Sequence, residues 1–223
     1  MKNFERLEFL IGKAALMKLN NATVAVIGLG GVGGFCAVTL ARCGIGNLLI
    51  QDYDIVEASN INRQIIANCD TVGKKKSDLL AVEIKKINPQ SRITVLDEPF
   101  NESSRLFSHN FDYLADAIDD INNKYLLIKK CIQEKVAFIS AMGAARKIDW
   151  RQLTVATIDA TAYDPLAKII RRKMRADGIA FQFPVVTSRE PPQKTSKLGS
   201  YMPVTAMAGI IMADYIIKKI IAD

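Results

Sequence analysis

The chain has 223 residues, of which 49% are hydrophobic and 24% charged, as expected for a globular protein with a substantial core. Its net charge of +7 favours a polyanionic partner without identifying one. The four cysteines form no C-x-x-C pair and suggest no disulfide framework, which argues against a structural zinc ribbon. Since no signal peptide precedes the first expected strand, we expect a reducing, cytoplasmic location.

The first part of the chain is predicted to alternate helices and strands. Apolar residues at helical spacing predict a helix over residues 3–20, and an apolar run predicts a strand over 22–28. A glycine-rich turn then opens a helix over 31–44. A strand over 47–52 and a loop with a short helix over 54–70 follow.

The same alternation continues through the middle of the chain. A helix over 74–88 stops at a proline, and residues 92–96 are predicted to form the third strand. A fourth strand over 112–117, a helix over 122–134 and a fifth strand over 137–140 follow. Such alternation implies a parallel sheet with helices on both of its faces.

The pattern changes after the fifth strand. Residues 153–158 alternate as a strand, and a basic helix is predicted over about 164–177. Residues 187–200 are rich in Ser, Thr, Pro and Lys, which predicts a mobile loop. The apolar stretch 202–221 contains three charged residues, which favours a buried or interfacial helix over a membrane span, so no membrane partner is expected.

These elements predict an α/β fold: a Rossmann-like, doubly wound and mostly parallel sheet, to which the C-terminal part adds strands and helices. We expect a single domain over residues 1–223. Residues 1–143 would form its nucleotide-binding part. Residues 144–223 would form the part that binds substrate or a second subunit.

The features with chemical meaning begin in residues 23–64. This stretch contains a strand, the turn GLGGVGG that starts at Gly28, a helix, a second strand, and then Asp52. Glycines let a backbone approach phosphates closely, and a carboxylate at the end of the second strand suits ribose hydroxyls. The combination predicts a nucleotide site, whereas the turn alone would also serve nicotinamide and flavin proteins.

Three further positions bear on which nucleotide is bound. Arg63 and Lys76 are cations that suit a triphosphate, although a lysine run such as 74–76 usually lies on a solvated helix face. Asp119 lies in the segment DAIDD at the end of the fourth strand, where carboxylates are good magnesium ligands. Asp120 fits an N-cap of the following helix better.

Together these motifs resemble the adenylating enzymes related to ubiquitin activation, a family that includes the adenylyltransferases of the molybdopterin and thiamine pathways. The matching segments are GLGGVGG, DYDIVEASNINRQ, the lysine after VGK, and DAIDD. The resemblance covers residues from about 5 to 223. It implies ATP and Mg²⁺ as cofactors and a homodimer as the common assembly.

The resemblance also implies roles by position. Those that would cradle the nucleotide and bind its ribose are Gly28, Gly30, Gly31, Gly33 and Asp52. Those that would hold or support the phosphates are Asn60, Arg63, Gln64 and Lys76, with Asp119 at the magnesium. Arg63, Lys76 and Asp119 would be catalytic, and Arg6 would reach the ATP of a partner subunit.

Within this family the chain most resembles the tRNA threonylcarbamoyladenosine dehydratases. Three features carry that resemblance: the opening RLEFLIGKAALMKL, the segment DPLAKIIRR from Asp164, and Lys124 where many activators of ubiquitin-like proteins have arginine. The zinc cysteines of the molybdopterin and thiamine branch are missing. No cysteine follows Cys131, so the position of the usual thioester nucleophile is empty.

This resemblance implies an ATP-dependent dehydratase that adenylates the threonyl carboxylate of the modified tRNA adenosine beside the anticodon, so that the group cyclises. The expected tRNA contacts on the basic helix are Lys168, Arg171, Arg172 and Arg175, although charge alone is equally consistent with a solvated helix. Two alternatives stay open: an adenylyltransferase for the C-terminus of a ubiquitin-like sulfur carrier, and a non-catalytic nucleotide- or tRNA-binding module. A sulfur-carrier or sulfur-relay partner also stays open, and His109 receives no role.

Overall fold

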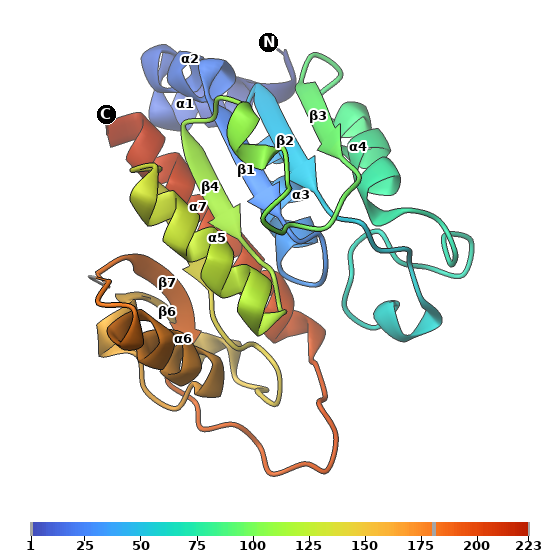
Figure 1. Ribbon diagram of the computed structural model, residues 1–223. Coiled ribbons are helices and arrows are strands. Elements are labelled where there is room, and N and C mark those ends of the chain that lie inside the picture. The colour runs from blue at the N-terminus through green and yellow to red at the C-terminus, as the bar shows by residue number, and fades with distance from the viewer. Residues whose placement is uncertain (1, 180–181, 223) are drawn as a thin grey trace.

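The computed structural model describes residues 2–179 and 182–222, which form one sheet with helices on both faces (Figure 1). The strands are β1 (Thr23–Ile27), β2 (Asn47–Gln51), β3 (Arg92–Leu96), β4 (Tyr113–Asp116), β5 (Phe138–Ala141), β6 (Leu153–Thr157) and β7 (Pro184–Ser188). The helices are α1 (Glu5–Ile11), α2 (Lys13–Asn21), α3 (Gly33–Arg42), α4 (Lys76–Ile87), α5 (Ile121–Gln133), α6 (Pro165–Ala176) and α7 (Met202–Ala222).

The sheet has the strand order β3-β2-β1-β4-β5-β7-β6. All neighbouring strands are parallel except β6 and β7, which are antiparallel. The central strands β1, β4 and β5 are almost wholly buried, as expected for parallel strands covered on both faces. The predicted Rossmann-like α/β fold is confirmed.

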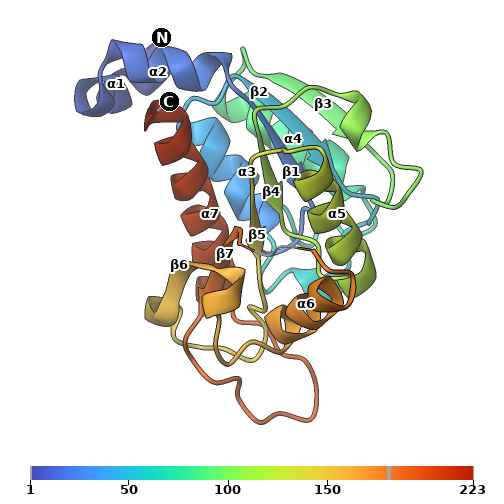
Figure 2. The same cartoon turned by 60° about the vertical axis from the view of Figure 1, so that its left-hand side comes forward.

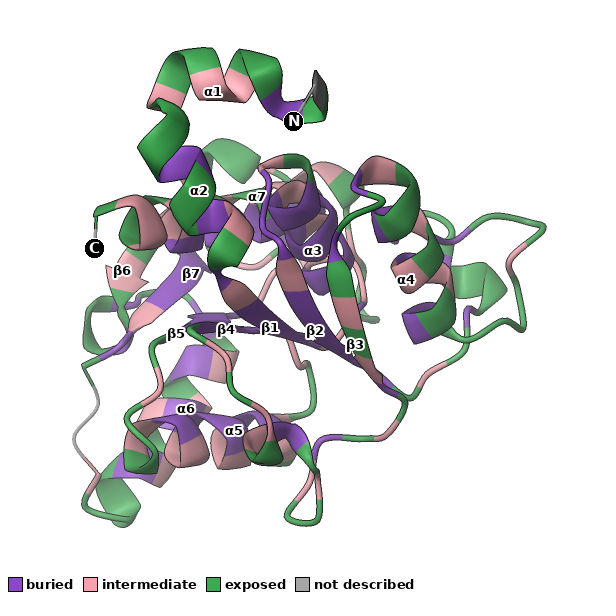
Figure 3. Ribbon diagram, turned by 90° about the horizontal axis from the view of Figure 1, so that it is seen from above, coloured by how far each residue is buried: buried purple, intermediate pink, exposed green. Residues whose placement is uncertain are grey.

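The sheet separates the core into two layers, and each layer is covered by helices. Figure 3 shows α3, α4 and α7 on one face of the sheet and α5 and α6 on the other. The first layer packs around side chains such as Leu40, Leu80 and Met212, and the second around side chains such as Leu127 and Ile170. Helices α7 and α3 lie side by side (Figure 2). Among the described residues, no helix is both long and apolar enough to cross a membrane.

Two predictions about the elements were wrong. The single helix over 3–20 is instead a 3-10 turn followed by α1 and α2, because Gly12 between them has φ 83° and ψ 160°, which no helix accommodates. The loop over 187–200 begins later, since residues 187–188 belong to β7, a strand that the sequence analysis missed. Strand β7 pairs with β5, so the C-terminal part extends the same sheet.

Candidate active site

A cavity of about 1150 Å³ opens beyond the carboxyl ends of β1 and β4. The strand order runs outward in opposite directions from these two strands, and open α/β sheets bind ligands at such a point. The cavity starts at Gly28 and Asp52 and extends past Asp119 to residues 141–147 and 198–200. Its volume slightly exceeds the about 300–1,000 Å³ that single ligand pockets usually span.

The glycine turn lets the backbone of α3 approach β1. Gly28 has φ +85°, and a Cβ there would lie 2.8 Å from the carbonyl oxygen of Ala117. A Cβ on Gly33 would lie 1.8 Å from the carbonyl oxygen of Gly28, so the turn closes only with glycine at both positions. Gly30 and Gly31 line the cavity, where the uncapped first turn of α3 leaves amides available to an anion. Gly33 supports the turn and does not line the cavity.

Asp52 fastens the end of β2 to this turn. Its Oδ2 accepts a hydrogen bond of 2.6 Å from the amide of Leu29, and its Oδ1 accepts one of 2.8 Å from the amide of Asp54. Burial raises the pKa of Asp52, although the two amides and the charge of Lys76 counteract that rise. Each carboxylate oxygen keeps a further lone pair for a ribose hydroxyl.

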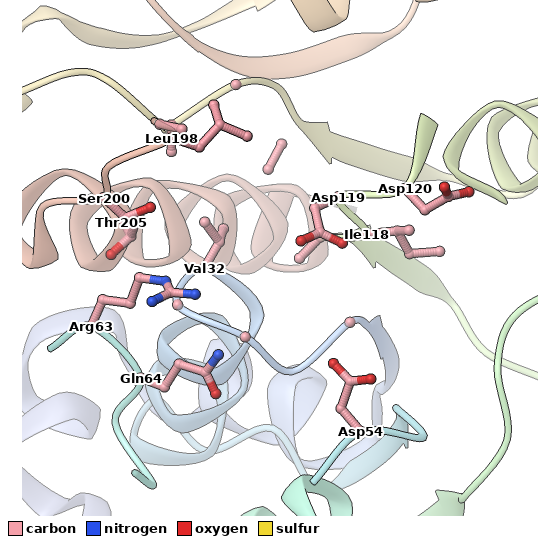
Figure 4. A pocket seen from close by; sticks show the side chains of 18 of the residues that line it. Val32, Asp54, Arg63, Gln64, Ile118, Asp119, Asp120, Leu198, Ser200 and Thr205 are labelled. Carbon is pink, nitrogen blue, oxygen red and sulfur yellow. The ribbon is translucent and has the colours of Figure 1, made fainter. Parts of the chain in front are cut away.

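Arg63 and Gln64 lie on one side of the cavity and Asp119 lies across from them (Figure 4). The guanidinium of Arg63 donates to the carbonyl oxygen of Ser59 at 2.8 Å and to Oδ1 of Asn62 at 3.0 Å, which holds it in place. The Oε1 of Gln64 is buried without a hydrogen-bond partner among the described residues. Arg63 is therefore held at the wall of the cavity, where Gln64 keeps an unused acceptor.

The loop that carries Arg63 is braced at two points. Asn60 is buried, and its Oδ1 accepts a hydrogen bond from the amide of Glu57, so its side chain supports a 3-10 turn while it lines the cavity. Asn62 donates to the carbonyl oxygen of Ser200 at 3.1 Å, which joins this loop to the segment before α7. Residues distant in sequence thus close the same cavity.

Lys76 begins α4 and is buried, whereas Lys74 and Lys75 are exposed. Its Nζ lies 2.7 Å from Oδ2 of Asp54, and its amide donates to the carbonyl oxygen of Asp54 at 3.0 Å. Lys76 is therefore a positioned cation at the cavity wall, while its two lysine neighbours lie on the solvated face that a lysine run usually occupies.

Asp119 and Asp120, in the acidic segment after β4, have different roles. Oδ1 of Asp120 accepts a hydrogen bond of 2.8 Å from the amide of Asn123, so Asp120 is the N-cap of α5, as predicted. Asp119 lines the cavity and makes no hydrogen bond or ion pair with the described residues. Its carboxylate remains available to a ligand.

A buried ion pair supports the loop of Asp119, and the sequence analysis missed it. Nζ of Lys124 lies 2.9 Å from Oδ2 of Asp116 and donates to the carbonyl oxygen of Ile118 at 2.9 Å; both charged side chains are fully buried. Ser140 donates to the same Asp116 oxygen at 2.5 Å. The available signal was the position of Lys124 in the apolar stripe of α5, where a charge needs a buried partner.

The remaining predicted residues lie away from the cavity. Arg6 is exposed on α1, which extends from the body of the molecule (Figure 3). On α6, Lys168, Arg172 and Arg175 are exposed. Arg171 is half-buried and donates to the carbonyl oxygens of residues 158 and 161, so its guanidinium is engaged with the fold.

The sequence profile of the ThiF family matches residues 4–223. The chain belongs to the ThiF family. This match confirms the predicted resemblance to the adenylating enzymes. The match includes every residue that lines the cavity, so the whole cavity belongs to one family architecture.

Particular ThiF relatives resemble the chain over its full length. The tRNA threonylcarbamoyladenosine dehydratase of Bacillus subtilis is 37% identical over 244 aligned positions, which cover 100% of this chain and 96% of that protein. Crystal structures of the Escherichia coli tRNA N6-threonylcarbamoyladenosine dehydratase in complex with AMP and with ATP superpose with a TM-score of 0.95 at 33% identity. They cover 99% of this chain and 94% of the E. coli chain.

Proposed function

We propose that this chain is an ATP-dependent tRNA threonylcarbamoyladenosine dehydratase that acts by adenylation. The observation that carries the proposal is full-length similarity to dehydratases, one of which forms complexes with ATP and AMP. The cavity supports it, because the glycine turn, Arg63, Lys76 and Asp119 converge where a nucleotide would lie and leave space for a second reactant.

In this proposal the two halves of the chain divide the labour. Residues 1–143 bind the nucleotide, with Asp52 at the ribose and Arg63 and Lys76 at the phosphates. Asn60 and Gln64 support those phosphate contacts, and Arg6 reaches the nucleotide of a partner subunit. Residues 144–223 bind the acyl substrate or form the dimer.

Asp119 suits magnesium. Mg²⁺ keeps several waters and is commonly held by one or two carboxylates together with substrate phosphates, and Asp119 offers an unengaged carboxylate at the cavity. No cluster of three or more potential metal ligands occurs in the described part of the chain, which agrees with a metal bound only together with the nucleotide. When bound, Mg²⁺ would offset charge on the phosphate oxygens.

The reaction follows from these positions. An oxygen of the threonyl carboxylate attacks the α-phosphorus of ATP, pyrophosphate leaves, and an acyl-adenylate forms. Arg63 and Lys76 stabilise the negative charge that grows on the phosphates. The carbamoyl group then closes onto the activated carbonyl and AMP leaves, so the substrate has lost the elements of water.

No enzyme nucleophile is needed for this sequence of steps. Burial raises the pKa of the Cys131 thiol, which disfavours the thiolate that a thioester would require. The ring closes within one molecule, and proximity supplies much of the acceleration.

The proposal extends to partners and location. The exposed cations of α6 would contact tRNA phosphates. Phe9 and Leu10 of α1 are 79% and 82% exposed, which supports a homodimer that covers this apolar surface and brings Arg6 to a partner. We place this activity in the cytoplasm, where a sulfur-carrier or sulfur-relay partner is the remaining candidate interaction.

The test is conversion of tRNA that carries threonylcarbamoyladenosine. Purified protein, ATP and Mg²⁺ should convert the modified nucleoside to a product lighter by one water, detected by mass spectrometry after digestion, and Arg63→Ala should lose this conversion. If the tRNA stays unchanged while a carrier protein ending in Gly-Gly is adenylated, the function is carrier activation. Nucleotide binding without pyrophosphate exchange would indicate a non-catalytic module.

A further inference from the structure

The cavity continues beyond the residues assigned to the nucleotide. Its second half is lined by residues 141–147 after β5, by one side of α6, and by residues 198–200 before α7. Most of these residues are small or apolar. Arg146 and Lys147 are the only cations among the described residues that line this half.

Lys147 is already engaged with the fold. Its side chain is buried, and its Nζ donates to the carbonyl oxygen of Ser188 at 3.2 Å. Burial lowers the pKa of Lys147, while the carboxylates of Asp164 and Glu190 raise it. Glu190 in turn accepts hydrogen bonds from the amides of residues 148 and 149. Lys147 therefore fastens the segment after β5 to β7.

Unlike Lys147, Arg146 is not held by side-chain hydrogen bonds to the described part of the fold. Its guanidinium makes no hydrogen bond or ion pair with the described residues, and its Nε is buried without a partner. A guanidinium stays charged at any physiological pH. A buried Nε that lacks an acceptor therefore destabilises the folded protein, unless a bound ligand supplies that acceptor.

The backbone of Arg146 is fixed on both sides. Its φ of 60° lies in the left-handed region, its amide donates to the carbonyl oxygen of Gly199 at 2.8 Å, and its carbonyl oxygen accepts from the amide of Gln193 at 2.7 Å. The strained residue is thus held between the segment after β5 and the loop before α7. Such strain is found where the surrounding structure imposes a functional position.

We propose that Arg146 binds the carboxylate of the acyl substrate in the second half of the cavity. This inference rests on the proposed function and names the residue that recognises its substrate. A carboxylate that approaches the polyphosphate of ATP meets repulsion, and a fixed cation on the acyl side offsets it. The planar guanidinium offers two parallel donors, which match the two oxygens of a carboxylate and orient one of them for attack.

The test compares Arg146→Gln with a matched control, Arg189→Gln. Arg189 is exposed and outside the cavity, so this variant removes the same charge without touching the site. For each protein we would measure the affinity for ATP, the affinity for tRNA with and without the threonylcarbamoyl group, and kcat/KM for cyclisation. Thermal unfolding of both variants checks that they are folded.

Arg146→Gln should lower kcat/KM for the modified tRNA by about tenfold or more, the loss expected for one charge-assisted contact. It should also reduce the preference for modified over unmodified tRNA and change the ATP affinity by less than about twofold, while Arg189→Gln resembles the wild type. An equal loss of affinity for unmodified tRNA, an equal loss for ATP, or unchanged kinetics would each overturn the assignment. Failure of the wild type to cyclise the tRNA would instead overturn the proposed function.

Discussion

Lys124 shows how much of the site depends on a residue that does not line it. Its ammonium group neutralises Asp116 and binds the carbonyl of Ile118, so the loop that presents Asp119 is held from below. Replacement of both members of a buried ion pair by apolar residues changes the free energy of unfolding little. Removal of one partner is costly, because the other charge is left buried and uncompensated.

We therefore expect Lys124→Met to reduce the free energy of unfolding by about 3–5 kcal/mol, measured by urea denaturation. The control is Lys129→Met on the same helix, where Nζ of Lys129 lies 3.0 Å from Asp177 at a half-exposed site. That pair is worth less than about 1 kcal/mol because water screens it. Equal losses for the two variants would contradict the structural role given to Lys124.

Asp52 gives a pH dependence whose sign follows from burial. Its pKa in the folded chain is raised above 3.8, so the folded state holds the proton more tightly than the unfolded state does. The contribution of Asp52 to stability therefore decreases as pH rises from 3.8 through the folded pKa and is constant above it. In the proposed ribose contact the ionised carboxylate is the better hydrogen-bond acceptor, so nucleotide affinity should have the opposite trend.

The affinity of the wild type for AMP, measured by calorimetry, should thus fall on acidification. The fall should begin at a higher pH than the value of about 3.9 at which an ordinary aspartate titrates. Asp52→Asn should bind AMP more weakly at neutral pH and lack this acid limb. If both proteins lose affinity in parallel over the same pH range, another group is responsible. Far-UV circular dichroism at each pH separates loss of binding from unfolding.

At the scale of elements, Asp164 joins α6 to the segment after β5. One carboxylate oxygen accepts from the amide of Ala167 at 3.0 Å and so caps α6, and the other accepts from the amide of Gly143 at 3.0 Å. Since Leu166 and Ile169 of α6 line the cavity, this carboxylate positions one wall of its second half, the half proposed to bind the acyl substrate and called the substrate half below.

Asp164→Ala should therefore cost more than loss of a helix cap alone. Asp120→Ala removes the exposed cap of α5 and should lower the unfolding free energy by about 1 kcal/mol. Asp164→Ala should lower it by about 2–3 kcal/mol, because the partly buried amide of Gly143 also loses its acceptor. Thermal and urea unfolding of the two variants provide the comparison, and equal costs would show that the bond to Gly143 contributes nothing.

Helices and strands with a clear hydrophobic periodicity were predicted from the sequence. Features that depend on tertiary contacts were not. The glycine turn and Asp52 belong to one local unit, and their geometry follows from short-range sequence. Strand β7 ends in Thr187 and Ser188, which continue into a polar loop, so only its pairing with β5 and β6 identifies it. The placement of Arg146 likewise depends on contacts across about 50 residues of sequence, which no local pattern encodes.

At the scale of the whole molecule, exposed positive charge on α6 lies close to the cavity. Lys168 and Arg172 are exposed and one helical turn apart on α6, and Leu166 and Ile169 of the same helix line the cavity. A tRNA that places its modified adenosine in the substrate half would therefore bring its phosphates near these cations. Arg171 is excluded from this surface because its guanidinium binds backbone carbonyls.

The double variant Lys168→Gln/Arg172→Gln should weaken tRNA binding in low salt and have little effect on AMP affinity. Each lost phosphate contact reduces the slope of log affinity against log salt by about 0.7–0.9, so loss of two contacts should reduce the slope by up to about 1.8. The control Lys218→Gln/Lys219→Gln removes the same charge at the end of α7, which lies at the opposite end of the molecule from α6 (Figure 1). If both double variants reduce the slope equally, net charge and not the α6 surface determines tRNA binding, whereas a loss confined to the α6 variant places the tRNA backbone beside the substrate half of the cavity.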